Sequence, residues 1–248
     1  MERLVIDFAM RQVKNKLEPH TRKCYIRKMQ AFCWTSVGLT YLLLIGGNFL
    51  KSQESTLGLS PPFAIFYFLL STLGWGALII LACRMTWKQP ALKNAPQKMR
   101  RLALAGLTGL FFQMLLGAWM KNRQAGLSCP EFPYCLQNFL PVPLSLDTAL
   151  AFTHRWWGFL MLGLFIQLAL AAARTFPPLA TSTRRAFSLA VAQVFLGIGT
   201  IQSHLHLHSR TLHAAVGYAL WGILVYVAIR TGSLSCTQNE KPKKKQGH

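Results

Sequence analysis

The stretch LALAGLTGLFFQMLLGAWM, Leu102–Met120, is a long apolar run without a charged side chain. Its length is close to the roughly 20 residues that an α-helix needs to cross the hydrocarbon core of a bilayer. Five further apolar runs of similar length lie on either side of it along the chain. The sequence therefore predicts an all-α integral membrane protein with six transmembrane helices, the other five being Ala31–Leu50, Pro62–Cys83, Ala149–Ala173, Ala186–Ser203 and Thr211–Ile229.

The composition supports a membrane protein over a soluble basic protein. Hydrophobic residues make up 52% of the chain and charged residues only 14%, yet the formal net charge is +20. A nucleic-acid-binding protein rarely combines these values, whereas a membrane protein with basic cytoplasmic edges does. We therefore expect membrane lipid as a partner and no nucleic acid.

The basic residues are distributed unevenly between the two sides of the predicted membrane protein. Six crossings place both termini on one side, and most of the 27 Lys and Arg residues fall on that side. By the positive-inside rule this side is cytoplasmic. We expect a bacterial inner membrane, with both termini in the cytoplasm. The basic residues assigned to the outer side are Lys51, Lys121, Arg123, Arg155 and Arg210.

Four regions follow from these patterns. Residues 1–28 form a basic cytoplasmic arm, and residues 29–100 form an amino-terminal half with two spans. Residues 101–230 contain four spans, enough for a four-helix bundle. Residues 231–248 form a basic cytoplasmic tail.

A polar loop with two cysteines, AGLSCPEFPYC, follows the Leu102–Met120 run on the predicted outer side. Pro130 and Pro133 prevent a helix between Cys129 and Cys135. An extracytoplasmic compartment favours disulfides, so we expect these two cysteines to pair. Two free thiols or a transient redox pair are the alternatives.

Two histidines open predicted helices on the outer side. His154 lies near the start of the fourth span and His213 near the start of the sixth, at similar depth. Histidines within a span tend to face the interior of a helical bundle. Paired in this way they are candidate axial ligands of a haem iron. Ordinary interfacial histidines are the alternative.

A second group of histidines, His204, His206 and His208, alternates with leucine on a short outer loop. The alternation is compatible with a divalent metal site. A solvated loop, or a loop packed over a cofactor, is the other interpretation.

Four motifs occur in order along the second half of the chain. They are Gly117–Cys135, His154-Arg155, Gln193 with Leu196, Gly197 and Thr200, and Leu212-His213. In this order they resemble the motifs of the haem A synthase family. The resemblance covers about Leu102 to Ile229, slightly over half of the chain.

The resemblance implies a cofactor and a set of ligands. Haem A synthases have two tandem four-helix bundles, each with a histidine pair on its outer side. The chain would then hold haem b in one bundle, with His154 and His213 on the iron and with Lys121 and Arg155 near the propionates. Haem O and haem A would be substrate and product.

The chain also departs from the family pattern. No histidine lies near Phe66–Phe68, where the first bundle of the family would have one. The family's catalytic bundle has a glutamate three residues before its first histidine, and Ala151 occupies that position here. Asp147 and Glu131 are the acidic residues that could stand in for it.

These observations lead to three hypotheses for function. The resemblance implies a membrane oxidoreductase of haem A biosynthesis and cytochrome oxidase assembly, which oxidises the C8 methyl group of haem O. The alanine at position 151 favours a non-catalytic bis-histidine haem b protein for electron transfer or haem delivery. A scaffold without haem is the third. A second copy of the chain, haem O synthase and oxidase assembly factors are the expected partners.

Overall fold

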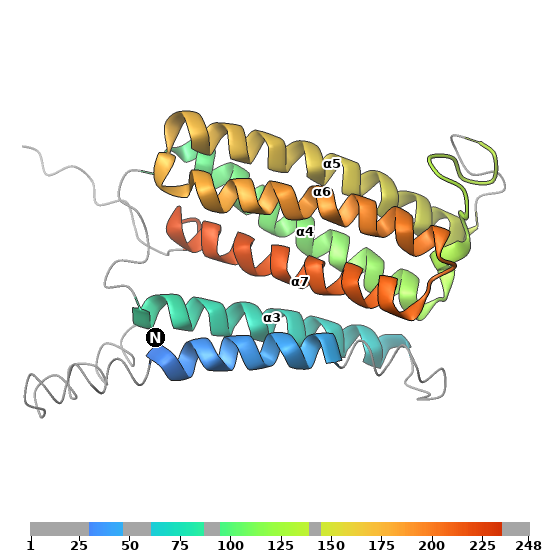
Figure 1. Ribbon diagram of the computed structural model, residues 1–248, viewed down its shortest axis with the longest axis horizontal. Helices are drawn as coiled ribbons and strands as arrows, with labels where there is room; N and C mark the ends of the chain where they lie inside the picture. Colours follow the sequence, from blue (N-terminus) through green and yellow to red (C-terminus); the bar gives the residue numbers. More distant parts are fainter. Residues whose placement is uncertain (1–29, 47–60, 87–94, 139–144, 235–248) are drawn as a thin grey trace, which may run out of the picture.

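The computed structural model describes residues 30–46, 61–86, 95–138 and 145–234, and this part of the chain is helical with no named strand. The helices are drawn in Figure 1. Their bounds are Gln30–Gly46, α3 Pro61–Thr86, α4 Gln97–Asn122, the 3₁₀ helix η1 Ala125–Leu127, α5 Leu146–Thr175, η2 Pro177–Leu179, α6 Ala180–Gln202 and α7 Leu207–Arg230.

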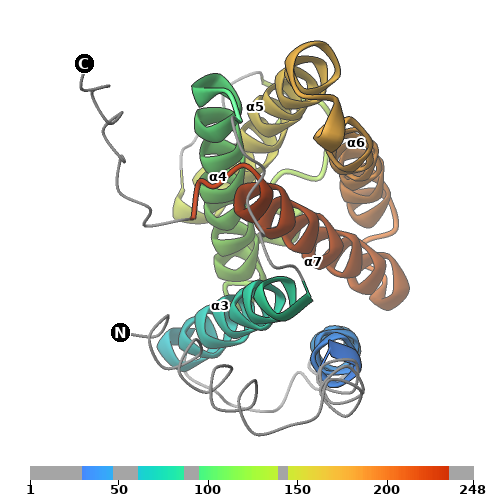
Figure 2. The same cartoon turned by 90° about the vertical axis from the view of Figure 1, so that its left-hand side faces the viewer.

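Helices α4 to α7 form an antiparallel four-helix bundle. Each packs on the next along the chain, and α7 packs back on α4, so the four make a closed ring. In the end-on view of Figure 2, α5 and α7 stand at opposite corners of this ring. Side chains on α5 and α7 that point inward therefore face each other across the bundle.

The helix Gln30–Gly46 and α3 lie together against the bundle, on the side formed by α4 and α7 (Figures 1 and 2). Trp75 of α3 links this two-helix layer, formed by Gln30–Gly46 and α3, to the bundle. Its Nε1 donates to the carbonyl of Val37 at 3.1 Å, and its ring stacks on Tyr41 and meets Tyr218 of α7 edge-on. The Tyr41 hydroxyl donates to the carbonyl of Ala215 at 2.9 Å.

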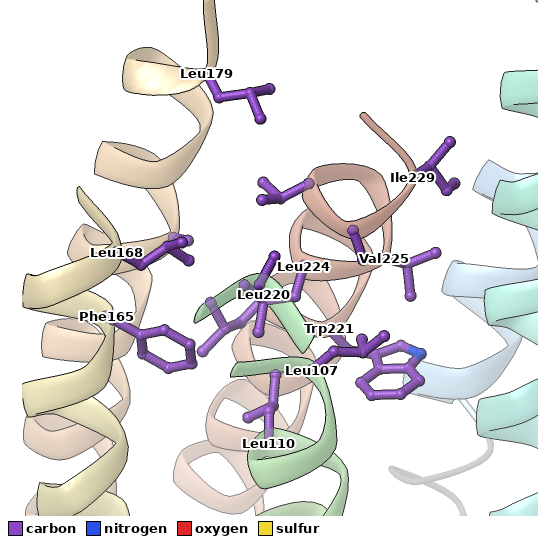
Figure 3. Close-up of a cluster of buried hydrophobic side chains, with 14 of the residues drawn as sticks. Leu107, Leu110, Phe165, Leu168, Leu179, Leu220, Trp221, Leu224, Val225 and Ile229 are labelled. Carbon is purple, nitrogen blue, oxygen red and sulfur yellow. The ribbon is translucent and has the colours of Figure 1, made fainter. Parts of the chain in front are cut away.

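The hydrophobic core fills the half of the bundle that lies away from the cysteine loop. Figure 3 shows leucines of α4, α5 and α7 meeting around Phe165. Apart from three near its start, the buried residues of α5 lie between Met161 and its carboxyl-terminal end. In α7 the buried residues begin only at Gly217. Between Ala190 and Thr200, α6 has no fully buried residue. The outer half of the bundle thus has fewer buried residues, and it contains both candidate histidines.

The predicted spans agree with the observed helices in number within the bundle. The four bundle helices are long and apolar enough to cross a membrane. They extend beyond the predicted Leu102–Met120, Ala149–Ala173, Ala186–Ser203 and Thr211–Ile229 at nearly every end. Charged and polar residues continue each helix into the interface, whereas an apolar run stops at the first of them.

The two remaining predicted spans correspond to shorter apolar helices within the described residues, Gln30–Gly46 and Phe68–Cys83 of α3. The end of the first predicted span, the basic arm at 1–28 and most of the tail at 231–248 lie outside the residues that the structure describes.

Candidate haem-ligand site

The amino-terminal end of α5 is fixed two turns before His154. The Ser145 hydroxyl accepts a hydrogen bond from the Thr148 amide at 3.1 Å, and the Thr148 hydroxyl accepts one from the Ser145 amide at 2.8 Å. This reciprocal cap satisfies amides that have no partner within the helix. The start of α5, and with it the height of His154 in the bundle, is therefore set by the sequence around Ser145.

His154 is held by two residues of the neighbouring helix α4. The Gln113 amide nitrogen donates to the His154 carbonyl at 2.9 Å and lies 3.3 Å from Nε2 of the imidazole. One turn further along α4, a Cβ atom added to Gly117 would come within 3.0 Å of the His154 Cε1 atom. The imidazole thus uses the space left by the glycine.

His213 is held by the same two residue types on α6. The Gln193 amide nitrogen donates to the His213 carbonyl at 2.9 Å, and a Cβ atom on Gly197 would lie 3.4 Å from Cε1 of His213. The motif Gln-x-x-Leu-Gly occurs at both Gln113–Gly117 and Gln193–Gly197. The helix pairs α4–α5 and α6–α7 therefore present their histidines in equivalent ways.

Sequence reasoning overlooked Gln113. Gln193 belongs to one of the family motifs, whereas the matching residue of α4 lies outside them. The signal that would have found it is the internal repeat of Gln-x-x-Leu-Gly, each copy preceding a histidine on the next helix.

The environment of both histidines fits a metal-bound cofactor. The Nδ1 atoms of His154 and His213 are buried and have no hydrogen-bond partner among the described residues. Buried polar atoms in proteins are normally paired, so such atoms indicate a missing ligand or a group that moves. Two imidazoles presented from opposite corners of the bundle, each with an unpaired nitrogen among the described residues, could hold a haem iron.

The cysteine loop covers this end of the bundle. Cys129 and Cys135 form a disulfide, as the loop composition predicted. Both cysteines are fully buried and pack on Ala151 of α5. The position at which the family pattern has its glutamate is therefore filled here by a small apolar contact between helix and disulfide.

Arg155 of α5 binds backbone carbonyls of the cysteine loop. Its guanidinium donates to the carbonyls of Cys129 at 2.8 Å and of Glu131 and Tyr134 at 2.7 Å. It also lies over the Phe132 ring, 5.6 Å from the ring centroid. The structure thus directs Arg155 to loop carbonyls, although it follows His154 directly in sequence.

The other charged candidates lie at the ends of the helices. Lys121 is in the last turn of α4. Arg123, just after α4, forms an ion pair with Asp147 in the first turn of α5, and this carboxylate holds the pKa of Arg123 above its ordinary value. The Glu131 carboxylate accepts the Gln137 amide at 2.6 Å. Both acidic residues considered as stand-ins for the family glutamate are thus bound within or beside the loops.

The histidine-rich loop between α6 and α7 has no metal site in the described part of the chain. No group of three His, Cys, Asp or Glu residues there is placed to hold an ion. The rings of His206 and His208 stack on each other at 5.1 Å. Leu205, between His204 and His206, contacts Gly126 of η1, where a Cβ atom would come within 2.9 Å of the leucine side chain. The loop therefore packs against the cysteine loop.

Fold and site together define a helical membrane protein whose bundle presents paired histidines, from diagonally opposite helices, beneath a disulfide-closed loop. A family model described as cytochrome oxidase assembly protein (COX15-CtaA) matches residues 56–225. The chain belongs to this family, which confirms the resemblance seen in the motifs. Membership and the four apolar helices establish it as an integral membrane protein.

Several curated relatives carry the name Heme A synthase. That of Sphingopyxis alaskensis is 30% identical over 154 residues, which are 56% of this chain and 42% of the relative. That of Macrococcus caseolyticus is 26% identical over 205 residues, 81% of this chain and 68% of the relative. A Bacillus cereus relative is 22% identical over 198 residues, 77% and 63% of the two chains. The chain thus spans from 42% to 68% of the length of these relatives.

Proposed function

We propose that this protein is a membrane haem protein of haem A biosynthesis, with one haem b held between His154 and His213. The observation that carries the proposal is the equivalence of the two sites. Each histidine has its carbonyl bound by a glutamine and its ring packed on a glycine of the preceding helix. Each also has a buried Nδ1 atom without a partner among the described residues. Relatives named Heme A synthase support the biosynthetic role.

The bound haem would supply the redox chemistry, and the chain would supply its placement. His154 and His213 would hold the haem iron, with their backbones positioned by Gln113 and Gln193. Lys121, at the end of α4, would pair with a propionate as an ammonium donor. The cysteine loop and the loop carrying Leu205 would keep water away from this end of the cavity, since they contact each other at Gly126.

The reaction that we propose first is oxidation of the C8 methyl group of haem O on the way to haem A. The support is the family motifs and the names of the relatives. Ala151 packs against the disulfide and has no group that can transfer a proton, so another residue would have to supply one. A second copy of the chain or an oxidase assembly factor is the partner that we propose for this step.

A second candidate is a non-catalytic haem b protein for electron transfer or haem delivery. The apolar contact at Ala151 favours it, as do the existing interactions of Asp147 with Arg123 and of Glu131 with the Gln137 amide. Both candidates share the haem site and differ only in whether the haem is converted.

For both candidates we propose six spans, with both termini in the cytoplasm of a bacterial inner membrane. The distribution of Lys and Arg supports this orientation. Within the bundle, the same orientation puts the cysteine loop, and so the Cys129–Cys135 disulfide, in an oxidising compartment.

Haem extraction from the purified protein distinguishes these candidates. The protein is produced in a host that makes haem O, and the extracted haem is separated by chromatography. Haem A or its hydroxylated precursor supports conversion, and haem b alone supports the second candidate. Either haem should disappear in His154→Ala and His213→Ala and remain in His206→Ala, which alters only the exposed outer loop. A wild-type protein without haem would contradict both candidates.

A further inference from the structure

A groove on the membrane-facing side of the molecule is separate from the histidine site. Its volume is about 610 Å³, and it lies between the helix Gln30–Gly46, α3, α6 and α7. Figure 2 shows the helix Gln30–Gly46 beneath α7, at the side of the molecule away from α5. The groove is within the size range of ligand sites, about 300–1,000 Å³.

The two ends of the groove differ in chemistry. At one end are Ser182 and Arg185, from the first turns of α6, and Tyr226, from the last turns of α7. Further in, the wall is apolar and includes Val37 and Ile79. A polar, aromatic mouth that leads into an apolar channel matches an amphiphile with its headgroup at the interface and its tail in the membrane.

Arg185 carries the charge at the mouth of the groove. The one ion pair among the described residues is Arg123–Asp147, so the Arg185 guanidinium has no carboxylate partner in that part of the chain. Most of the basic residues are also assigned to this side of the membrane, the side expected to be cytoplasmic. The complement of such a site is an anion, and Ser182 adds a hydroxyl donor one turn away on the same helix.

Gly38 keeps the middle of the groove open. It lines the groove, and a Cβ atom built there would have no atom within 4 Å. The absence of a side chain at this position leaves room beside Trp75 for a narrow, flexible chain. An acyl chain fits such a space, whereas a further transmembrane helix, about 10 Å across, does not.

We propose that this groove binds one anionic phospholipid, with its phosphate on Arg185 and Ser182 and one acyl chain running past Gly38 toward Trp75. The lipid comes from the leaflet at the amino-terminal end of α6. Because it contacts the helix Gln30–Gly46 as well as α6 and α7, it would link the two-helix layer to the bundle.

Native mass spectrometry of the detergent-solubilised protein tests the headgroup contact. The probes are phosphatidylglycerol and phosphatidylcholine with identical acyl chains. We expect one phosphatidylglycerol to be retained in preference to phosphatidylcholine, and Arg185→Gln to weaken its binding about fivefold, the effect of one basic side chain near a membrane surface. Arg184→Gln is the matched control, because Arg184 is the neighbouring exposed residue and does not line the groove. Equal losses in both variants would overturn the proposal.

Filling the channel tests the tail contact. Gly38→Leu adds a side chain to the groove at a position where the Cβ atom has open space, and we expect it to reduce phosphatidylglycerol retention. Gly46→Leu lies on the same helix, also in open space but outside the groove, and should leave retention unchanged. Quenching of tryptophan fluorescence by brominated phosphatidylglycerol should fall in parallel, with the Trp34 contribution taken as the difference from Trp34→Phe because the chain has seven tryptophans. Retention that is unaffected by Gly38→Leu, or equal for both lipids in the wild type, would contradict the assignment.

Discussion

Gln113 and Gln193 are the residues that make the two histidine sites equivalent. Each amide donates to the carbonyl of its histidine, so it fixes the position of the histidine backbone on the adjacent helix. The carboxamide oxygens of both glutamines are buried without a partner among the described residues. A polar group bound beside the histidines would satisfy them.

Replacing either glutamine should weaken haem retention. In Gln113→Leu the His154 carbonyl loses its donor, and a lost neutral hydrogen bond costs about 1 kcal/mol, or roughly a fivefold faster release of haem. The rate of haem transfer to an apo-myoglobin acceptor measures this. Gln167→Leu, on the exposed face of α5, is the control. Equal transfer rates in the two variants would show that Gln113 does not position the ligand.

The glycines beside the histidines predict a graded effect. An added Cβ atom would be 3.0 Å from the imidazole at Gly117, 3.4 Å at Gly197 and in open space at Gly163. We expect Gly117→Ala to perturb the haem absorption spectrum most, Gly197→Ala less and Gly163→Ala not at all, because the added methyl group crowds the imidazole most at Gly117, slightly at Gly197 and not at Gly163. A spectrum that changes equally in all three would argue against direct packing on the ligands.

At the scale of elements, the cysteine loop is organised by Arg155 of α5. Its guanidinium satisfies three loop carbonyls at 2.7–2.8 Å, so the loop is tied to the helix that carries His154. Arg155→Ala should therefore raise amide hydrogen exchange in residues 129–138. Arg174→Ala, near the exposed end of the same helix, should not. If amide exchange is unchanged but the haem spectrum is lost, Arg155 binds a haem propionate, as the family resemblance implies, and does not organise the loop.

The disulfide should contribute modestly to stability. It closes a short ring, and the loop-closure estimate for such a ring is about 2–3 kcal/mol. The double variant Cys129→Ser/Cys135→Ser should lower the free energy of unfolding by this amount in a denaturant titration in detergent. A much larger loss would mean that packing of the disulfide on Ala151 matters more than ring closure.

At the scale of the whole molecule, the sequence predicts the bundle well and the contacts of its outer end less well. Apolar runs are long enough to locate four helices, and the positions of His154 and His213 near helix starts place them at one end of the bundle. The partners of Arg155 could not be predicted, because carbonyls of an irregular loop leave no pattern in the residue types. The only sequence signal for Gln113 is the internal repeat of Gln-x-x-Leu-Gly at Gln113–Gly117 and Gln193–Gly197.

The two-helix layer shows the same limit. The apolar run Pro62–Cys83 correctly predicts the helix α3. The role of Trp75 could not be predicted, because its contacts with Tyr41 and Tyr218 depend on how three helices pack. Packing of this kind is decided by side-chain shape between distant segments, which apolar periodicity does not encode. The groove beside Trp75 follows from that packing and has no signature in the sequence.

Electron paramagnetic resonance of the oxidised, haem-loaded protein is the most direct test of the central claim, that His154 and His213 ligate one haem iron. We expect a low-spin bis-histidine signal from the wild type. His154→Ala and His213→Ala should each lose that signal and become high-spin or lose the haem, while His206→Ala keeps it. A low-spin signal that survives either of the first two substitutions would contradict the account.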